Sequence, residues 1–147
     1  MGPKGMRYFA RIQLLIACAL VTSTAWAASP CDGVSRSLTD ERRTALAPGI
    51  ARQLEASFGR PVAKVDVLQS FQFGGWDIIY VDTHESDEAF LFYAHDPLTS
   101  RYITMWSGAA MWNEEQEIRK WTVDNAPGIP LKLATCFAWH VTKDRDK

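Results

Sequence analysis

Residues 65–81 read VDVLQSFQFGGWDIIYV, and this stretch decides the fold. Large apolar side chains recur at alternate positions before and after the pair Gly74–Gly75, and a period of two is typical of β-strands. Two glycines between two such runs predict a two-residue turn, because both central positions of a type I′ turn need positive φ. We therefore expect an antiparallel hairpin with strands over residues 62–73 and 76–83. The alternating residues are Val65, Val67, Phe71 and Phe73 before the turn, and Trp76, Ile78 and Tyr80 after it.

Two further strands are expected to follow this hairpin. A polar loop over residues 84–88 leads into a predicted strand over residues 89–95. A turn follows over residues 96–100, with Pro97 at its second position. It leads into another predicted strand over residues 101–107. Successive short connections of this kind predict a four-strand meander.

Helical patterns lie on both sides of the meander in the sequence. Thr39 is a predicted N-cap and Gly59 a predicted C-cap, with apolar residues at every fourth position between them. Pro48 interrupts this pattern, so we expect a kink or two short helices. Asn113 is predicted to cap a second helix, which cannot pass Asn125 because a Pro-Gly-Ile-Pro run follows.

A last strand is predicted over residues 131–141, with Leu133, Phe137, Trp139 and Val141 on one face. The expected order is thus α-β-β-β-β-α-β. We expect an α+β fold, in which an antiparallel sheet of about five strands, the meander plus the C-terminal strand, has its helices packed on one face.

Residues 1–27 have the features of a secretory signal peptide. Three basic residues precede a short apolar run over residues 12–21, and Ala25-Trp26-Ala27 is a typical cleavage site. The run is too short to cross a bilayer as a helix, which takes about 20 residues. We expect cleavage after Ala27 and one α+β domain over residues 28–147, periplasmic or secreted. The competing prediction is a bacterial lipoprotein with a lipid anchor at Cys18.

Two cysteines remain after the expected cleavage, Cys31 and Cys136. In an exported chain such a pair predicts a disulfide bond, which would tie the N-terminal arm to the last element. The alternative is two buried free thiols.

The charge balance excludes some classes of partner. The chain has 16 Lys and Arg and 17 Asp and Glu. Residues 1–27 contain three of the basic residues and none of the acidic ones, so residues 28–147 have 13 basic and 17 acidic side chains and a net charge of −4. Nucleic acids and anionic membranes bind through an excess of Lys and Arg, so neither is expected as a partner.

No motif in the chain names a reaction. We find no G-x-S-x-G frame, H-E-x-x-H pair, phosphate-binding glycine loop or dinucleotide fingerprint. We therefore expect a protein that is not an enzyme and has no cofactor.

One polar cluster lies at the end of the second predicted strand. A metal site would need these side chains to converge, but residues along a strand alternate faces and the spacing matches no calcium loop, so no metal is expected. The alternatives are a solvated hairpin tip, or an exposed acidic loop that steers a basic partner into place. The cluster is Asp82, His84, Glu85, Asp87 and Glu88.

Five other residues are candidates for structural or functional roles. Trp76 and Trp112 lie at the ends of elements and are expected to be exposed, where aromatic residues form protein interfaces or stack on sugars. His95 and His140 lie in predicted strands and are interpreted as structural. Asp77 follows the glycine turn and is interpreted as an acceptor that stabilises the turn, with a functional acid as the alternative.

These observations favour a small exported binding protein of a bacterial envelope. The concrete hypothesis is an inhibitor or immunity protein that blocks a basic toxin or a secreted hydrolase. Alternatives are a glycan- or peptidoglycan-binding module that uses exposed tryptophans, and a small-molecule-binding α+β domain. The predicted partner-binding residues are Trp76, Asp82, His84, Glu85, Asp87, Glu88 and Trp112.

Overall fold

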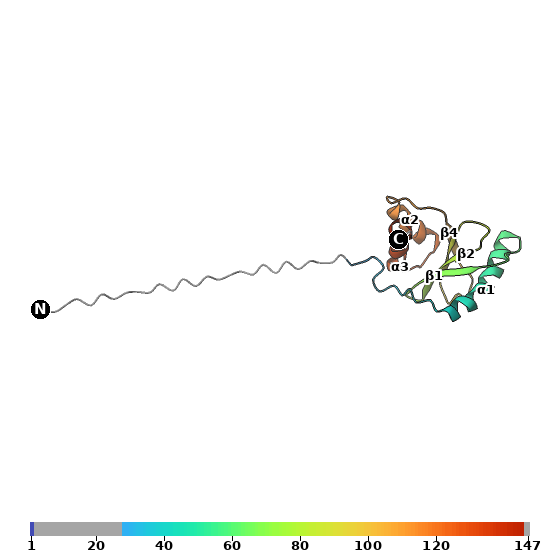
Figure 1. Cartoon of the computed structure of the whole chain (residues 1–147). Coiled ribbons are helices and arrows are strands. Elements are labelled where there is room, and N and C mark those ends of the chain that lie inside the picture. Colours follow the sequence, from blue (N-terminus) through green and yellow to red (C-terminus); the bar gives the residue numbers. More distant parts are fainter. Residues whose placement is uncertain (2–27, 146–147) are drawn as a thin grey trace.

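The computed structural model describes residue 1 and residues 28–145, and a four-stranded antiparallel sheet lies at its centre (Figure 1). The predicted signal peptide and the lipid anchor at Cys18 lie outside the described residues. The strands follow one another across the sheet in chain order, so the predicted α+β meander is confirmed. The elements are α1 (Asp40–Phe58), β1 (Asp66–Phe73), β2 (Trp76–Asp82), β3 (Ala89–Tyr93), β4 (Thr104–Ser107), α2 (Glu115–Asn125), α3 (Leu131–Trp139) and a final π-helical turn (His140–Asp144).

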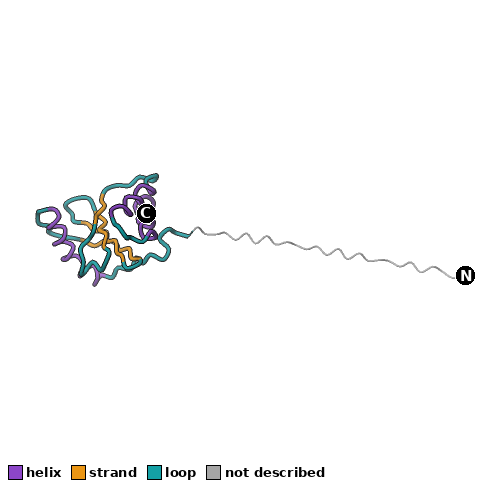
Figure 2. The backbone as a smooth tube through the Cα atoms, turned by 180° about the vertical axis from the view of Figure 1, so that it is seen from behind, coloured by secondary structure: helices purple, strands orange, loops and turns teal. Residues whose placement is uncertain are grey.

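Helices cover both faces of the sheet, so the prediction that they pack on one face is wrong. Helix α1 packs its buried face against Ile79 and Leu91, whereas α2 and α3 pack against Ile78 and Phe92. Figure 2 shows the strands between these two helical layers. The reason is visible in β2 and β3, where apolar residues occupy consecutive positions and nearly all are buried. A sheet that is apolar on both faces needs a covering layer on each.

The segment over residues 131–141 is helical, so the predicted fifth strand is wrong. Leu133, Phe137 and Val141 recur every fourth position, a spacing that fits one face of a helix as well as one face of a strand. The residues between them decide the outcome, because Ala134 and Ala138 favour a helix and are themselves buried against the sheet.

Helix α1 is continuous through Pro48, so the expected alternative of two short helices is wrong. Pro48 is exposed, and so is Thr44, whose carbonyl has no N–H donor at Pro48. The caps are confirmed: Thr39 Oγ1 accepts a hydrogen bond from the Arg42 N–H, and Gly59 ends the helix with a φ of 67°. Helix α2 begins later than predicted, with Glu114 rather than Asn113 at its N-cap.

A β-bulge divides β1 into two parts. The pairing with β2 shifts between Val67 and Gln69, so that Val67 faces α1 whereas Phe71 faces α3. The alternation in the sequence suggested that the apolar residues of β1 lie on one face. They contribute instead to both cores. The turn itself is as predicted, with φ of 60° at Gly74 and 81° at Gly75.

The N-terminal arm is fixed at two points. The predicted disulfide between Cys31 and Cys136 is confirmed and joins the arm to α3. Beyond it, Ser35 pairs with Gln72 of β1 through two backbone hydrogen bonds of 2.8 and 2.9 Å. The arm thus lies along the outer edge of β1.

Candidate functional site

The acidic loop, residues 83–88, lies at the end of the sheet where β2 stops and β3 starts. β4 also ends here, since Ala89 pairs with Ser107. The segment that contains Trp112 leaves the sheet from the same end. The turn before Trp76 lies at the opposite end, because β2 runs between them. The structure therefore separates Trp76 from the other predicted partner-binding residues.

The first half of the acidic loop is attached to the body of the protein. His84 Nε2 lies 2.7 Å from Asp66 Oδ2 on β1, and the His84 N–H donates to Asp82 Oδ1 over 2.6 Å. Arg60, just after α1, forms an ion pair with Glu85. Hydrogen bonds from Lys64 and His84 hold the pKa of Asp66 below its ordinary value. His84 has a φ of 59°, a conformation that non-glycine residues adopt only where surrounding contacts fix it.

The charges of this loop divide into two groups. Glu85 forms an ion pair with Arg60, and Asp82, the last residue of β2, contacts the His84 ring. Asp87 and Glu88 are exposed at the end of the loop. A partner would therefore meet the carboxylates of Asp87 and Glu88 first.

Trp112 is exposed, as predicted, and Trp76 is not. Trp112 has 68% of its surface exposed and its neighbour Met111 has 66%. Lys143 Nζ lies 5.2 Å from the centre of the Trp112 ring, and Lys143 also pairs with Glu115. Two large apolar side chains side by side on a connection are unusual unless something covers them.

Trp76 is only 8% exposed, so the expectation that it lies at the surface is wrong. It belongs to the core between the sheet and α3 and lies close to Gly128. Trp76 lies at the end of a strand, but α3 and the loop before it, which are distant in sequence, fold over that end.

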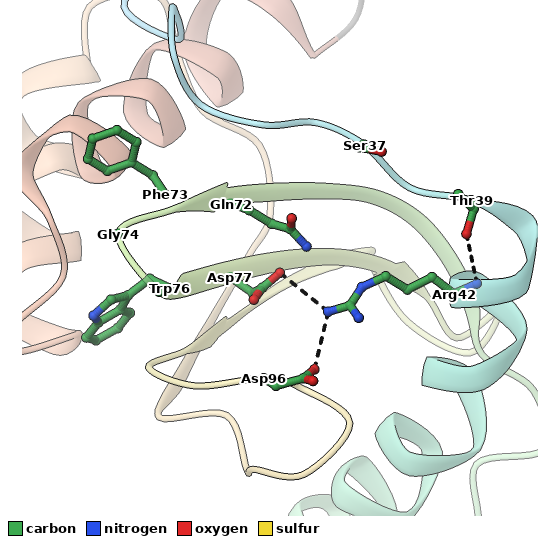
Figure 3. A pocket seen from close by; sticks show the side chains of 10 residues that line it. Ser37, Thr39, Arg42, Gln72, Phe73, Gly74, Trp76, Asp77 and Asp96 are labelled. Atoms are coloured by element: carbon green, nitrogen blue, oxygen red, sulfur yellow. Dashed lines mark hydrogen bonds and ion pairs between the residues drawn. The ribbon is translucent and has the colours of Figure 1, made fainter.

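A groove of about 600 Å³ lies at the other end of the sheet, beside the glycine turn. Four segments form it: the arm before α1, the first turn of α1, the β1–β2 hairpin and the connection after β3. Figure 3 shows Arg42 reaching from α1 toward Asp77 on β2 and Asp96 on the connection. Arg42 Nη2 lies 3.9 Å from Asp77 Oδ1 and 3.3 Å from Asp96 Oδ1.

Asp77 is the buried acid of this groove, with 8% of its surface exposed. Desolvation raises its pKa, an effect that the Gln72 amide and the charge of Arg42 oppose. Its Oδ1 accepts no hydrogen bond from the described residues, and the buried Nε of Arg42 donates none to them. Asp77 occupies the strand face that it shares with Ile79 and Val81. The sequence singled out Asp77 because it follows the glycine turn, and a charge on an otherwise apolar strand face is a further local signal for it; nothing local pointed to Arg42, Gln72 or Asp96.

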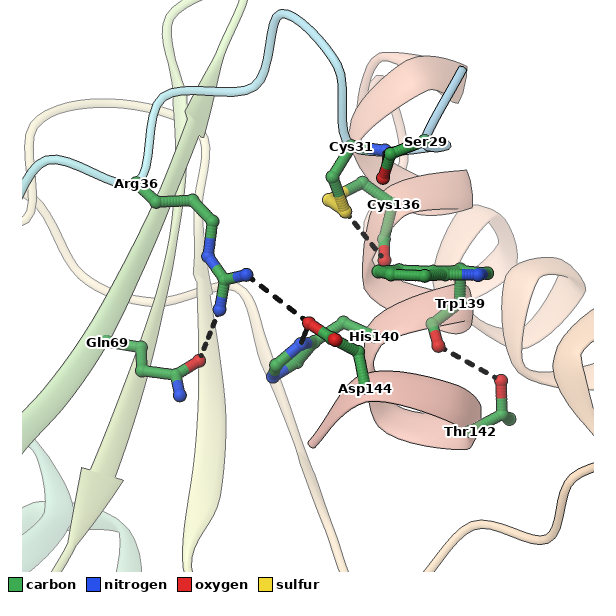
Figure 4. Close-up of a disulfide and its surroundings, with 9 residues drawn as sticks. All are labelled: Ser29, Cys31, Arg36, Gln69, Cys136, Trp139, His140, Thr142 and Asp144. Atoms are coloured by element: carbon green, nitrogen blue, oxygen red, sulfur yellow. Dashed lines mark hydrogen bonds and ion pairs between the residues drawn. A yellow bond between two sulfur atoms is a disulfide. The ribbon is translucent and has the colours of Figure 1, made fainter. Parts of the chain in front are cut away.

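His140 forms a second buried polar cluster, near the disulfide (Figure 4). Its ring lies 4.9 Å from that of Phe71, and its Nδ1 lies 3.3 Å from Asp144 Oδ2. Arg36 pairs with Asp144 at 3.5 Å. Burial lowers the pKa of His140, and the charge of Arg36 acts in the same direction. His140 lies on the π-helical turn rather than on a strand, and His95 is exposed.

In the described part of the chain, no three His, Cys, Asp or Glu side chains are grouped so that they could hold a metal ion. None of the helices in residues 28–145 is both long and apolar enough to cross a bilayer.

Comparison of the chain with protein-family models, with curated proteins and with solved structures found no match.

Proposed function

We propose that this protein is an exported, non-enzymatic binding protein of a bacterial envelope that blocks a basic toxin or hydrolase through its acidic loop. The observation that carries this proposal is the contrast within the loop. His84 and Glu85 are held by Asp66 and Arg60, while Asp87 and Glu88 remain exposed beyond them.

This arrangement suits the capture of a basic surface. Exposed carboxylates attract a basic partner over a distance of about 10 Å at ordinary salt, which increases the association rate. A loop that is already ordered loses little conformational freedom on binding, so less of the interaction energy is lost.

The exposed pair Met111 and Trp112 supplies the apolar contact that such an interface needs. Tryptophan and methionine are enriched in protein interfaces, and tryptophan often contributes more binding energy than its neighbours. Both the loop and this pair leave the same end of the sheet. The disulfide is compatible with a non-cytoplasmic location, in agreement with export.

The test is affinity capture from the envelope of the native organism with tagged residues 28–147, at low and at moderate salt, read by mass spectrometry. The decisive variant is Asp87→Lys/Glu88→Lys. The matched control is Asp32→Lys/Glu41→Lys, which changes the net charge by the same amount on exposed residues of the arm and α1.

We expect one protein that is retained by the wild type and by the control, released as the salt rises, and lost with the loop variant. A partner that binds the loop variant and the control equally well would contradict the proposal.

The exposure of Trp112 favours a second candidate, a module that binds peptidoglycan or other glycans by stacking. A Trp112→Ala variant distinguishes the two. Stacking predicts that soluble wall fragments change the tryptophan fluorescence of the wild type and not of this variant, whereas the inhibitor proposal predicts no response from either.

A further inference from the structure

We propose that the groove at the glycine-turn end of the sheet binds a small organic cation, namely a primary ammonium or guanidinium group on a short chain. This site is separate from the acidic loop, which lies at the other end of the sheet. The proposal therefore does not depend on the function proposed above.

The net charge of the groove favours a cationic ligand. Three ionisable side chains line the groove, Arg42, Asp77 and Asp96. One guanidinium faces two carboxylates, which leaves a net charge of −1. An anionic ligand would be repelled, whereas a monovalent cation would bring the groove to neutrality.

Burial of the Asp77 carboxylate is energetically unfavourable. Taking a carboxylate out of water is unfavourable unless it is paired and hydrogen-bonded. Here the only cation within 4 Å among the described residues is Arg42, at 3.9 Å; the Gln72 amide hydrogen-bonds the carboxylate, but its buried Oδ1 accepts no hydrogen bond. Such under-compensated acids cluster at functional sites, because ligand binding supplies the missing partner.

Arg42 is shared rather than committed to Asp77. It is closer to Asp96, at 3.3 Å, than to Asp77. Asp96 also accepts a hydrogen bond from the Leu98 N–H, which fixes its carboxylate in the wall of the groove (Figure 3). A ligand ammonium that approaches between the two acids would therefore have one fixed and one buried carboxylate to bind.

The groove has room for a short alkyl chain beside the two acids. A volume of about 600 Å³ lies within the range of small-molecule sites, roughly 300–1,000 Å³. One wall is the turn of Gly74 and Gly75, which has no side chains, and Phe73 beside it is 36% exposed. An alkyl chain could lie along this wall with its ammonium group at the acids.

The experiment uses three probes of matched size: n-butylamine, n-butanol and butyrate. Each is titrated into ¹⁵N-labelled residues 28–147, and the amide shifts of Gly74, Gly75 and Asp77 are followed. We expect saturable shifts with butylamine only. Equal shifts with butanol or butyrate, or no saturation with any probe, would overturn the proposal.

Three variants locate the site. Asp77→Asn and Asp96→Asn should each weaken butylamine binding by about tenfold or more. Asp87→Asn, in the acidic loop, is the matched control and should leave it unchanged. Since Asp96 is half exposed, its variant remains informative even if Asp77→Asn does not fold. Unaltered binding in both groove variants would overturn the proposal.

A fourth variant should change the affinity for butylamine in the opposite direction. Arg42→Gln removes the resident cation, so butylamine should bind several times more tightly. If Arg42 only supports the local structure, affinity would fall or stay constant, which counts against the proposal.

The source of the cation is distinguished last, with cadaverine, a peptide that contains an internal lysine, and a lysine-free peptide with a free N-terminus. Preference for cadaverine indicates a free polyamine, and preference for either peptide indicates a segment of another protein.

Discussion

Gly74 lies directly against Pro130: a β-carbon built on Gly74 would be 2.9 Å from the Pro130 Cγ. This contact joins the β1–β2 turn to the start of α3. Both turn glycines have positive φ, but only open space surrounds a β-carbon placed on Gly75.

The two glycines therefore provide a matched pair of substitutions. Gly75→Ala should lower the free energy of unfolding by about 1–2 kcal/mol, the cost of a left-handed conformation for a residue with a β-carbon. Gly74→Ala should lower it further, because the Pro130 ring must move as well. Urea unfolding measures both, and equal losses would show that the Pro130 contact is not rigid.

Asp77→Asn should stabilise the protein at neutral pH, by up to about 1 kcal/mol. Desolvation raises the pKa of Asp77 above its ordinary value of 3.8, so the folded state holds this proton more tightly than the unfolded state. The folded state thus loses stability as the pH rises through the pKa of Asp77, and asparagine avoids that loss.

Urea unfolding at neutral pH and below pH 3.8 tests this account. The difference between the variant and the wild type should disappear at the lower pH, where Asp77 is protonated in both states. A variant that is less stable at neutral pH would mean that the pairing with Arg42 outweighs the desolvation of the acid.

The buried His140 should make stability fall as the solution becomes acidic. Burial lowers its pKa below the ordinary 6.5, with Arg36 and Arg145 opposing the charged form and Asp144 favouring it. Between its lowered pKa and 6.5 the unfolded state binds the proton better, so the stabilisation is complete above pH 6.5 and is lost below it.

The measurement is the pH dependence of urea unfolding for the wild type, for His140→Phe and for His95→Phe. The loss just below pH 6.5 should be absent in His140→Phe and retained in His95→Phe, whose histidine is exposed. If all three curves coincide, His140 is not the titrating group.

Removal of the disulfide should lower the free energy of unfolding by about 2–5 kcal/mol, since it closes a long loop in the unfolded chain. The sequence separation of its cysteines is 105 residues. Cys31→Ser/Cys136→Ser should unfold at lower urea, and a reductant should lower the midpoint of the wild type but not that of the variant. An unchanged midpoint in the variant would contradict the expected role of the bond.

Local chemistry made much of the fold predictable. The glycine turn, the Thr39 and Gly59 caps and the alternation in β2 each depend on a few neighbouring residues. Helix α3 was predicted as a strand because Leu133, Phe137 and Val141 are four residues apart, which fits either period. Consecutive buried residues such as Ile78 and Ile79 carried the correct signal that both faces of the sheet are covered.

The two candidate sites also differ in how far the sequence predicts them. The acidic loop is one continuous segment and was identified from its composition, although its attachment through Arg60 and Asp66 was not. The groove draws residues from four separate segments, so its geometry depends on tertiary packing. Only Asp77 was named from the sequence, because it follows the glycine turn.

The attachment of the N-terminal arm has a consequence for aggregation. A sheet edge with unpaired backbone groups is a template for association with other chains. Ser35 pairs with Gln72 on the β1 edge, and the disulfide holds the arm in register a few residues before it. We expect reduction to loosen the arm and to leave the β1 edge, like that of β4, open to pairing with strands of other chains. On this view the disulfide limits strand-mediated self-assembly as well as unfolding.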